Sequence, residues 1–388
     1  MSDQRRRRPR TRVAKGTSRV GERFEAVVGP VAHGGHCIVR LPALRDGSSL
    51  ASSGTEFNRV VFVRHAIPGE RVVLEITEGT DGDRFWRGDA VSVLEPSPDR
   101  VSPPCRYAGP SGCGGCDFQH VALPAQRALK TTVVREQLSR LAGLTWDGEV
   151  EEVPGAPDGL GWRTRQRYVR LPDGGRAMRK HRSHDLVPVD TCLLEAPAPS
   201  AHTALGRSFQ VAEGGFWQVH PGAPDILVST VLELLGPRPG ERCLDLYAGV
   251  GLFAGFLAEA VGESGQVVAI EGDATASALS ASNCPGIEAR AGSVADVLAT
   301  PPPGSTVAAP VDLVVLDPPR EGARRVVVEQ VVARQPRAVA YVACDPAALA
   351  RDVAIFAEHG YVVRDLRGFD LFPMTSHVEV VALLSKGK

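Results

Sequence analysis

Short apolar runs alternate with longer stretches of helical composition from about residue 222 to the end of the chain. The apolar runs are 242–248, 266–272, 312–318, 338–345 and 377–385. Parallel strands need a long crossover connection, which a helix usually provides, so this alternation predicts a parallel α/β sheet of the Rossmann type. We assign the predicted α/β domain to residues 211–388.

The residues before this domain follow different patterns. Residues 21–97 contain short β-rich runs separated by Gly, Ser and Asp turns, which predicts a small β-barrel. A Pro-rich segment at 96–104 indicates a boundary, and residues 98–210 combine a helical stretch (about 124–142) with β-rich pieces. We therefore expect a mixed α+β central domain at 98–210.

The net charge of the 388-residue chain, −1, conceals an uneven distribution. Residues 1–20 contain eight basic side chains and one acidic one, a net charge of +7. Such an arm is typical of a disordered tail that binds phosphates, or of a solvated tail without a partner. The composition is that of a globular protein, with no apolar run of bilayer length and no secretory signal. We expect a cytoplasmic monomer without a membrane partner.

Four of the eight cysteines form a candidate metal site. Cys105, Cys113 and Cys116 have the spacing C-x7-C-x2-C in a Gly- and Pro-rich stretch, and Cys192 is the fourth candidate. In a cytoplasmic chain, clustered thiols with this spacing indicate metal ligands rather than disulfides. Four thiolates suit tetrahedral zinc or an iron–sulfur cluster, and the spacing alone does not separate the two.

The first strand of the α/β domain leads into a glycine-rich loop. Asp245 lies near the end of the apolar run, and Gly249 and Gly251 precede a helix, where backbone amides can approach a ligand. Glu271 ends the next strand, twenty residues beyond Gly251, where a carboxylate can hold a ribose diol. This pattern fits a dinucleotide as well as S-adenosylmethionine (SAM).

Three further side chains lie where an α/β fold places ligand-binding and catalytic groups. Asp317 and two prolines follow one strand, similar to the Asp/Asn-Pro-Pro loops of SAM-dependent methyltransferases. Cys344 follows the next strand, which makes it a candidate nucleophile, although a lone cysteine is more often a small buried residue. Glu379 lies in a β-branched run, where burying a carboxylate is costly unless it has an ionic partner or a catalytic task.

In this order, the motifs resemble bacterial RNA (uracil-5-)-methyltransferases that have an N-terminal TRAM domain, a [4Fe–4S] central domain and a SAM-binding catalytic domain. The resemblance covers residues 21–388 and rests on the cysteine cluster and on FWQVHP, DLYAGVGLF, LDPPREG, YVACDP and HVEVVALL. It implies an OB-like barrel, an iron–sulfur central domain and a Rossmann-like SAM-dependent methyltransferase domain. It also implies methylation of uridine C5 in RNA, with 23S ribosomal RNA favoured over the T-loop of transfer RNA.

The resemblance assigns functions to individual residues. It implies that Cys344 is the nucleophile that adds to uracil C6 and that Glu379 is the base that removes the C5 proton. The implied SAM contacts come from Gln218, Tyr247, Gly249, Gly251, Glu271 and Asp317. The implied [4Fe–4S] ligands, with zinc as the alternative metal, are Cys105, Cys113, Cys116 and Cys192.

The sequence departs from the family pattern beside the nucleophile. Asp345 stands where the family commonly has Asn, and its charge would raise the pKa of the Cys344 thiol unless a cation such as Arg320 compensates.

A second RNA contact is predicted from the Arg-rich segment 162–168. Arg163, Arg165 and Arg167 recur at period two, which predicts a strand with one face toward phosphates, or else an ordinary solvated hairpin.

Three other classes of protein fit the sequence less well than a methyltransferase does. A zinc-containing RNA-binding protein leaves Asp317, Cys344 and Glu379 without a task. A nicotinamide-dependent oxidoreductase gives no reason for the basic segments. A DNA cytosine methyltransferase also uses a cysteine nucleophile and SAM, but it typically has a Pro-Cys motif.

Overall fold

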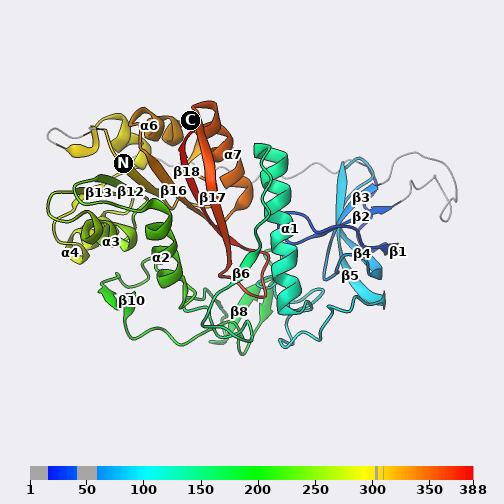
Figure 1. The fold of residues 1–388 in the computed structure, drawn as a ribbon. Helices are drawn as coiled ribbons and strands as arrows, with labels where there is room; N and C mark the ends of the chain where they lie inside the picture. The colour runs from blue at the N-terminus through cyan, green and yellow to red at the C-terminus, as the bar shows by residue number, and fades with distance from the viewer. Residues whose placement is uncertain (1–15, 42–58, 302–304, 309, 388) are drawn as a thin grey trace. The chain divides into compact units, whose positions relative to one another are not determined.

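The computed structural model describes residues 16–41, 59–301, 305–308 and 310–387, which divide into two compact units (Figure 1). Most of the basic arm predicted at 1–20 therefore lies outside the described residues. No helix in the described part of the chain is both long and apolar enough to cross a bilayer.

The first unit comprises residues up to 102 together with 109–111 and contains one five-stranded sheet. Its strands, in the spatial order β1-β4-β5-β3-β2, are β1 Arg23–Val27, β2 Cys37–Leu41, β3 Arg59–Arg64, β4 Arg71–Glu78 and β5 Phe85–Glu95.

The chain after β1 closes this sheet by pairing with β2. The Gly29 N–H donates to the Ile38 carbonyl, and the Ile38 N–H donates to the Pro30 carbonyl, both at 2.9 Å. A Cβ at Gly29 would lie 2.5 Å from the Ile38 oxygen, so the closure requires glycine there. This closed β-structure agrees with the small barrel predicted from the short β-rich runs.

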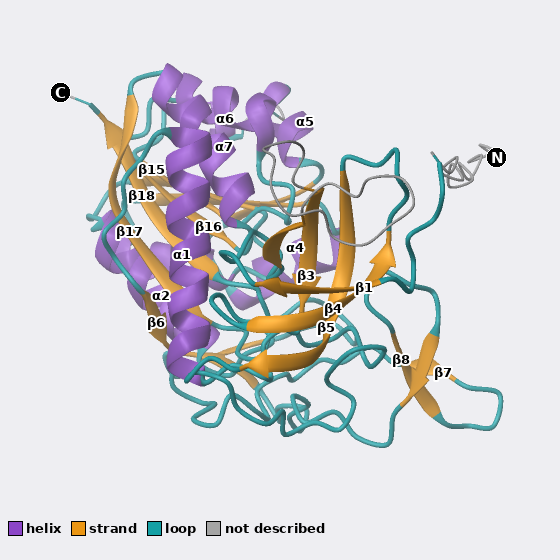
Figure 2. Cartoon of the chain, turned by 90° about the vertical axis from the view of Figure 1, so that its right-hand side faces the viewer, coloured by secondary structure: helices purple, strands orange, loops and turns teal. Residues whose placement is uncertain are grey.

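The second unit, residues 103–108 and 112–387, contains an eight-stranded sheet with helices on both faces (Figures 1 and 2). Its helices are α1 Leu123–Ala142, α2 Ala223–Leu235, α3 Leu252–Val261, α4 Ala274–Asn283, α5 Val294–Ala299, α6 Arg324–Ala333, α7 Pro346–Glu358 and the 3-10 turn η1 Thr306–Ala308. The strands of the sheet, in spatial order, are β14 Glu288–Ala291, β13 Gln266–Glu271, β12 Arg242–Leu246, β15 Leu313–Leu316, β16 Ala338–Ala343, β18 Glu379–Lys386, β17 Tyr361–Asp370 and β6 Val150–Glu152. Small strands outside it are β7 Val169–Arg170, β8 Arg176–Arg179, β9 Leu186–Pro188, β10 His202–Ala204 and β11 Arg207–Phe209.

The five neighbouring strands from β14 to β16 are all parallel. β18 runs antiparallel to β16, β17 runs antiparallel to β18, and β6 is parallel to β17. The predicted Rossmann-type alternation is therefore right for five strands, but the prediction of an entirely parallel sheet is wrong, because a strand that follows β17 without an intervening helix reverses direction. This reversal places Glu379, the first residue of β18, at the carboxyl end of β16.

Alternate residues of the central strands pack into two separate cores. Val314 and Leu316 of β15 contact the core formed with α1, α5, α6 and α7, whereas Leu313 and Val315 contact the core formed with α2 and α3. All four side chains are fully buried. Successive side chains of a strand point to opposite faces of the sheet. When helices cover both faces, all of these side chains are buried, and the sequence of the strand is a continuous apolar run.

The central region joins the α/β sheet directly. The helix predicted at about 124–142 is present as α1, with Pro124 in its first turn and Gly143, at φ +64°, ending it. The α1 helix lies on the same face as α7, and β6 extends the sheet at its edge. The strand predicted over 162–168 is wrong, since this segment is irregular except for an isolated bridge at Arg163.

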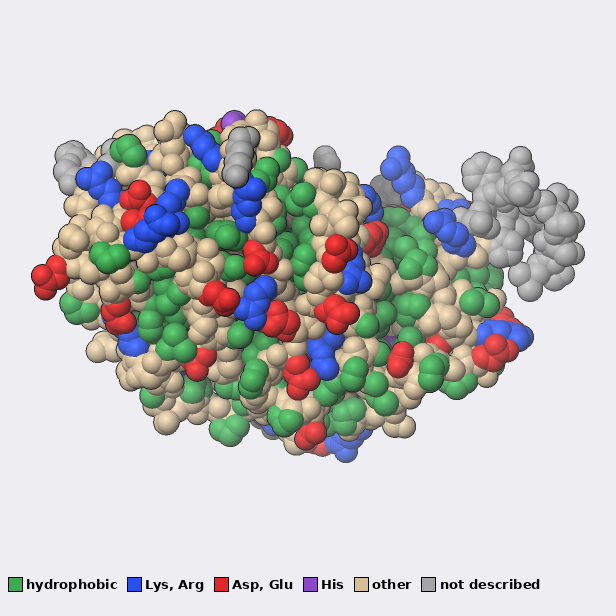
Figure 3. Space-filling view, in the orientation of Figure 1, with side chains coloured by type: hydrophobic (Ala, Val, Ile, Leu, Met, Phe, Trp, Pro, Cys, Tyr) green, Lys and Arg blue, Asp and Glu red, His purple; other side chains and the backbone are tan. Residues whose placement is uncertain are grey.

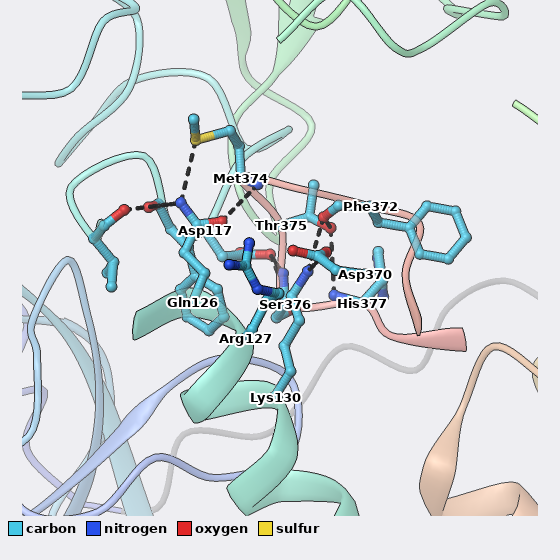
Figure 4. A network of polar contacts seen from close by, with 12 residues as sticks. Asp117, Gln126, Arg127, Lys130, Asp370, Phe372, Met374, Thr375, Ser376 and His377 are labelled. Carbon is cyan, nitrogen blue, oxygen red and sulfur yellow. Dashed lines mark hydrogen bonds and ion pairs between the residues drawn. The ribbon is translucent and has the colours of Figure 1, made fainter. Parts of the chain in front are cut away.

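A buried ion pair joins α1 to the end of β17. Lys130 Nζ lies 2.5 Å from Asp370 Oδ1 and donates to the Phe372 carbonyl at 3.0 Å (Figure 4). The two charged side chains are 1% and 3% exposed. Removing one partner of such a pair leaves the other charge buried and uncompensated.

We predict that Lys130→Met lowers the free energy of unfolding by about 3–5 kcal/mol, because it leaves Asp370 buried without its cation. Urea unfolding followed by circular dichroism measures this change. The matched control is Arg140→Met on the same helix, whose partner Glu136 is 3.8 Å away and whose side chain is 68% exposed. The control is expected to change stability by less than about 0.5 kcal/mol, and an equally small effect of Lys130→Met would contradict the prediction.

Candidate active site

The two predicted catalytic side chains lie at the adjoining ends of neighbouring strands. Ala343, the last residue of β16, pairs with Val380 of β18. Cys344 directly follows the first of these residues and Glu379 directly precedes the second, so the antiparallel register brings the thiol and the carboxyl group to the same point of the sheet edge. Glu379 is 4% exposed, whereas Cys344 retains partial solvent access.

Asp317 and Arg320 belong to the same electrostatic neighbourhood. Burial raises the pKa of the Cys344 thiol to about 12; the charge of Glu379 adds to this rise, and Arg320 opposes it. Burial also raises the pKa of Glu379 well above its usual range, with Asp317 adding to the rise and Arg320 again opposing it. Burial therefore favours the protonated form of both groups, and added positive charge would favour the thiolate and the carboxylate.

Asp345, which departs from the family pattern, has a structural task. Its Oδ1 accepts the Ala348 N–H at 2.8 Å and caps the N-terminus of α7. Asp and Asn are both favoured N-cap residues, which explains why either fits this position. The charge of Asp345 contributes to the raised pKa of Cys344, as the sequence predicted, but less than burial and Glu379 do.

The loop that contains Asp317 and Arg320 is held by a side chain that sequence reasoning missed. Asp352 of α7 accepts the Ala323 N–H at 2.7 Å and the Tyr341 hydroxyl at 2.5 Å. Gly322, at φ +83°, allows the loop to approach Asp352 closely, since a Cβ there would lie 2.6 Å from the Asp352 carboxylate. No sequence signal marks Asp352, because it is one acid within a helix and its backbone partner is 29 residues away.

His377 is a second residue that sequence reasoning missed. Its Nε2 lies 2.9 Å from Arg320 Nη2, and burial lowers the pKa of His377 to about 4, which keeps the ring neutral. A neutral ring can accept a hydrogen bond from the guanidinium group. The position of His377, two residues before Glu379, is the signal that could have identified it.

The glycine-rich loop forms a tight turn between β12 and α3. Tyr247 has a φ of +66°, and Gly251 has a φ of +92° at the N-cap of α3. A Cβ at Gly251 would lie 2.9 Å from Cys284 Sγ, so this turn needs glycine. The Gly249 N–H donates to Glu271 at 2.9 Å, which brings the predicted loop and ribose-binding residues together.

Two carboxyl groups beside this loop have raised pKa values, and one of them has an oxygen without a hydrogen-bond partner among the described residues. Asp245 accepts the Ala254 N–H at 2.8 Å with one oxygen, while its other oxygen has no hydrogen-bond partner among the described residues. Burial raises the pKa of Asp245 to about 7, and burial together with the charge of Glu271 raises the pKa of Asp317 to about 7. A cationic or hydrogen-bonding ligand would relieve both groups.

Gln218 is a predicted SAM contact that has no hydrogen bond to the other predicted contacts in the described part of the chain. It lies in an irregular segment between Trp217, which packs on Phe209, and Val219, whose carbonyl accepts the Thr164 N–H at 3.0 Å. No hydrogen bond joins Gln218 to the other five predicted residues within the described part of the chain.

The four predicted metal ligands line one pocket in the second unit. Cys105, Cys113 and Cys116 approach it from one loop and Cys192 from another. Gln119 connects two of them, since it donates to Cys116 Sγ at 3.2 Å and accepts the Cys105 N–H at 3.0 Å. Burial raises the pKa of the Cys116 thiol to about 12, and the charges of the neighbouring cysteines add to this rise.

The four cysteines line one shared cavity. All eight cysteines of the chain are free thiols. Among the described residues, no group of three or more His, Cys, Asp and Glu side chains has the spacing that a single metal ion requires. Four free thiols around one pocket are a donor set that suits zinc and an iron–sulfur cluster alike.

The predicted Arg-rich face at 163–167 does not form. Arg163 lines the cysteine pocket, and Arg165 donates to the Gly215 carbonyl at 2.7 Å and lies over the ring of Phe216. Only Arg167 of the three arginines is exposed. The three arginines alternate with other residues in the sequence, but the segment is not a strand, so the arginine side chains do not share a face.

Comparison with known proteins adds to this geometry. The profile of the TRAM domain matches residues 17–91, and that of the tRNA (Uracil-5-)-methyltransferase family matches residues 309–387. A protein of Streptomyces avermitilis described as an uncharacterized RNA methyltransferase is 43% identical, over 94% of this chain and 98% of its own length. The 23S rRNA (uracil(1939)-C(5))-methyltransferase RlmD of Halomonas elongata is 31% identical, over 84% of this chain and 85% of its own length. The chain belongs to the RNA (uracil-5-)-methyltransferase family.

A solved structure supports the fold of this family member. The tRNA (uracil-54, C5)-methyltransferase of Pyrococcus abyssi, crystallised with S-adenosyl-L-homocysteine, superposes with a TM-score of 0.61. It is 21% identical and covers 84% of this chain and 94% of its own length. The family predicted from the motifs, including the TRAM domain, is confirmed.

We predict that Asp317→Asn stabilises the ligand-free RNA methyltransferase at pH 8 but not at pH 4. The folded carboxyl group, with its pKa raised to about 7, holds its proton more tightly than the unfolded one, so wild-type stability falls as the pH rises from about 4 to about 7. After allowance for partial solvent access, the variant should gain about 1–3 kcal/mol at pH 8. Denaturant unfolding at both pH values measures this gain. Equal stabilities of variant and wild type at pH 8 would contradict it.

Proposed function

We propose that this protein methylates C5 of uridine in RNA, with SAM as the methyl donor and a transient covalent bond between Cys344 and C6 of the base. The supporting observation is the antiparallel register of β16 and β18, which places a thiol beside a buried carboxyl group at the sheet edge where α/β folds bind ligands. A nucleophile and a base at one point are what substitution at C5 requires, because uracil C5 alone is too weakly nucleophilic to take a methyl group.

The proposed chemistry balances with these two side chains. The Cys344 thiolate forms a bond from Sγ to C6, and the electron pair of the C5=C6 bond becomes an enolate shared by C5 and O4. SAM supplies the methyl group, which C5 takes as its bond to the donor sulfur breaks. The Glu379 carboxylate then removes the C5 proton, the C5=C6 bond re-forms, and the bond from Sγ to C6 breaks.

Binding of both substrates prepares the pair for this reaction. Burial favours the protonated forms of Cys344 and Glu379, and Arg320 is the cation that favours their ionised forms. A positively charged methyl donor beside Asp317 weakens the like-charge repulsion that this carboxyl group exerts on Glu379. The target uridine must leave its base stack to reach a cysteine with only partial solvent access.

The SAM site of this proposal lies at the carboxyl ends of β12, β13 and β15. The backbone of Gly249 and Gly251 approaches the ligand, Glu271 holds its ribose hydroxyls, and Asp317 lies beside its charged part. The positive φ of Tyr247 and the unpaired oxygen of Asp245 support a ligand at this loop, since strain and unsatisfied buried groups persist where a ligand compensates for them. Gln218 and Tyr247 complete the proposed contacts.

For the central region we propose a [4Fe–4S] cluster bound by Cys105, Cys113, Cys116 and Cys192. The pocket that all four cysteines line supports a shared metal group. The resemblance of the cysteine spacing to the [4Fe–4S] methyltransferases favours the cluster over zinc. As functional divisions we propose a tail at 1–20, a TRAM barrel at 21–97, a cluster-binding region at 98–210 and a catalytic domain at 211–388.

The RNA substrate that we propose is 23S ribosomal RNA. The relative with 31% identity is named for that substrate, whereas the structural neighbour named for tRNA is 21% identical. Basic and acidic side chains are interspersed on the face of the second unit that Figure 3 shows. RNA is therefore expected to dock through several patches, with affinity that falls as salt rises.

Glu379→Gln should accumulate the covalent enzyme–RNA adduct and lower turnover by about 10²–10⁴-fold, because proton removal from C5 is lost while the attack by Cys344 remains. Denaturing gel electrophoresis with labelled RNA detects the adduct as a slow band. The matched controls are Cys344→Ala and the double variant, which should form no adduct and transfer no methyl group while binding SAM with wild-type affinity. Full methylation by Cys344→Ala would overturn the covalent mechanism.

Labelled SAM should transfer its methyl group to the ribosomal RNA fraction of cells that lack the enzyme. The product of hydrolysis should be 5-methyluridine, and mapping by reverse transcription and mass spectrometry should locate it in 23S rRNA. A label that appears only in the transfer RNA fraction would reject the proposed substrate while leaving the proposed reaction intact.

A further inference from the structure

The segment between β17 and β18 leads directly to Glu379, and residues of the central region hold it (Figure 4). Lys130 binds Asp370 and the Phe372 carbonyl at the start of this segment. Gln126 accepts the Met374 N–H at 2.8 Å in its middle. These two side chains of α1 fix the first half of the segment, which also contains a non-glycine residue, Met374, at φ +65°.

Asp117 holds the second half of the segment. Its Oδ2 accepts both the Ser376 N–H at 3.0 Å and the Ser376 hydroxyl at 2.9 Å. Its own backbone N–H donates to the Met374 carbonyl at 3.0 Å. These bonds connect positions 259 residues apart in the chain, and in Figure 4 the Asp117 and Ser376 side chains point toward one another.

Asp117 also directly follows a predicted cluster ligand. Cys116 precedes it, and Gln119 connects Cys116 Sγ to the Cys105 backbone. The position of Asp117 is therefore tied to the cysteine pocket through the peptide chain and through the side chain of Gln119. Any displacement of Cys116 displaces the backbone of Asp117 with it.

The other side of Ser376 leads to the proposed catalytic pair. His377 contacts Arg320 at 2.9 Å, and Arg320 is the cation that opposes the effect of burial on both Cys344 and Glu379. Glu379 lies three residues beyond Ser376. A shift of Ser376 would therefore loosen the contact between His377 and Arg320 and move the start of β18.

We propose that Asp117 is a positioning residue that couples the cysteine pocket to the catalytic pair, through its two hydrogen bonds to Ser376. This proposal rests on the proposed function of Cys344 and Glu379. Asp117 touches neither the base nor the methyl donor in this account; it acts by fixing the segment that presents His377 and Glu379.

The coupling is separable from folding. Lys130 and Gln126 continue to hold the first half of the segment when the Asp117 side chain is removed, and its backbone N–H still donates to the Met374 carbonyl. The second half of the segment loses its bonds to the Asp117 side chain but keeps the bond from the His377 N–H to Thr375 Oγ1 at 3.3 Å. A purely structural residue would change stability without changing the ionisation of Cys344.

The test compares Asp117→Ala and Asp117→Asn in the full-length, metal-loaded protein. For Asp117→Ala we expect kcat for methyl transfer to fall by about 10–100-fold, with the KM for SAM within about twofold of wild type. The pH dependence of Cys344 alkylation by iodoacetamide, followed on its peptide by mass spectrometry, should shift to higher pH because Arg320 no longer opposes burial as strongly. Asp117→Asn keeps an oxygen acceptor for Ser376 and should restore most of both properties.

The matched control is Asp312→Ala at the opposite end of β15. Asp312 also accepts a backbone N–H, that of Arg242, at 2.8 Å, so its loss tests the general effect of removing one such bond. It should leave kcat and the alkylation profile unchanged. Metal content, measured by elemental analysis, should be the same in Asp117→Ala, Asp117→Asn and wild type.

Unchanged kcat and an unchanged alkylation profile in Asp117→Ala would overturn the coupling. If Asp117→Ala fails to fold, Ser376→Ala removes only the hydroxyl donor, and the proposal requires it to shift both properties in the same direction by a smaller amount; wild-type behaviour of Ser376→Ala overturns the coupling as well. Full methylation by Cys344→Ala would instead reject the proposed function, while the alkylation profiles still decide the coupling.

Discussion

The antiparallel pairing of β18 with β16 is the constraint on which the proposed chemistry depends. It sets Glu379 beside Cys344, because the first residue of one strand meets the residue that follows the last of the other. A parallel β18 would place Glu379 at the opposite edge of the sheet, a full strand length away from the thiol. The reversal follows from β17, which precedes β18 without an intervening helix.

Burial stabilises the sheet, but it also disfavours the charged forms of the side chains at the edge that contains Cys344 and Glu379. Cys344, Glu379 and Asp317 all have raised pKa values, and burial is the largest cause in each case. The sheet edge is therefore poised for ligands that bring positive charge and hydrogen bonds, and it is less stable without them at alkaline pH. Asp352 and Asp117 hold the two loops that supply Arg320 and His377, so the ordering of this edge comes from residues outside it.

The sequence was sufficient for features that depend on local pattern. The strand–helix alternation predicted the Rossmann-like core, and the order of the motifs predicted the family. It was insufficient where position depends on distant partners: periodicity does not encode the direction of β18, and Asp117 and Ser376 meet across 259 residues. The prediction of a shared arginine face at 163–167 was wrong for a related reason. A period of two residues predicts a shared face only where the backbone forms a strand.

The release of tritium from RNA labelled at C5 of uridine tests the central claim most directly. If Cys344 and Glu379 substitute a methyl group for the C5 proton, each methyl group transferred from SAM releases one tritium atom to water. The account predicts this one-to-one ratio in the wild type and no release by Cys344→Ala. Methylation of RNA without tritium release would place the methyl group at another atom and contradict the account.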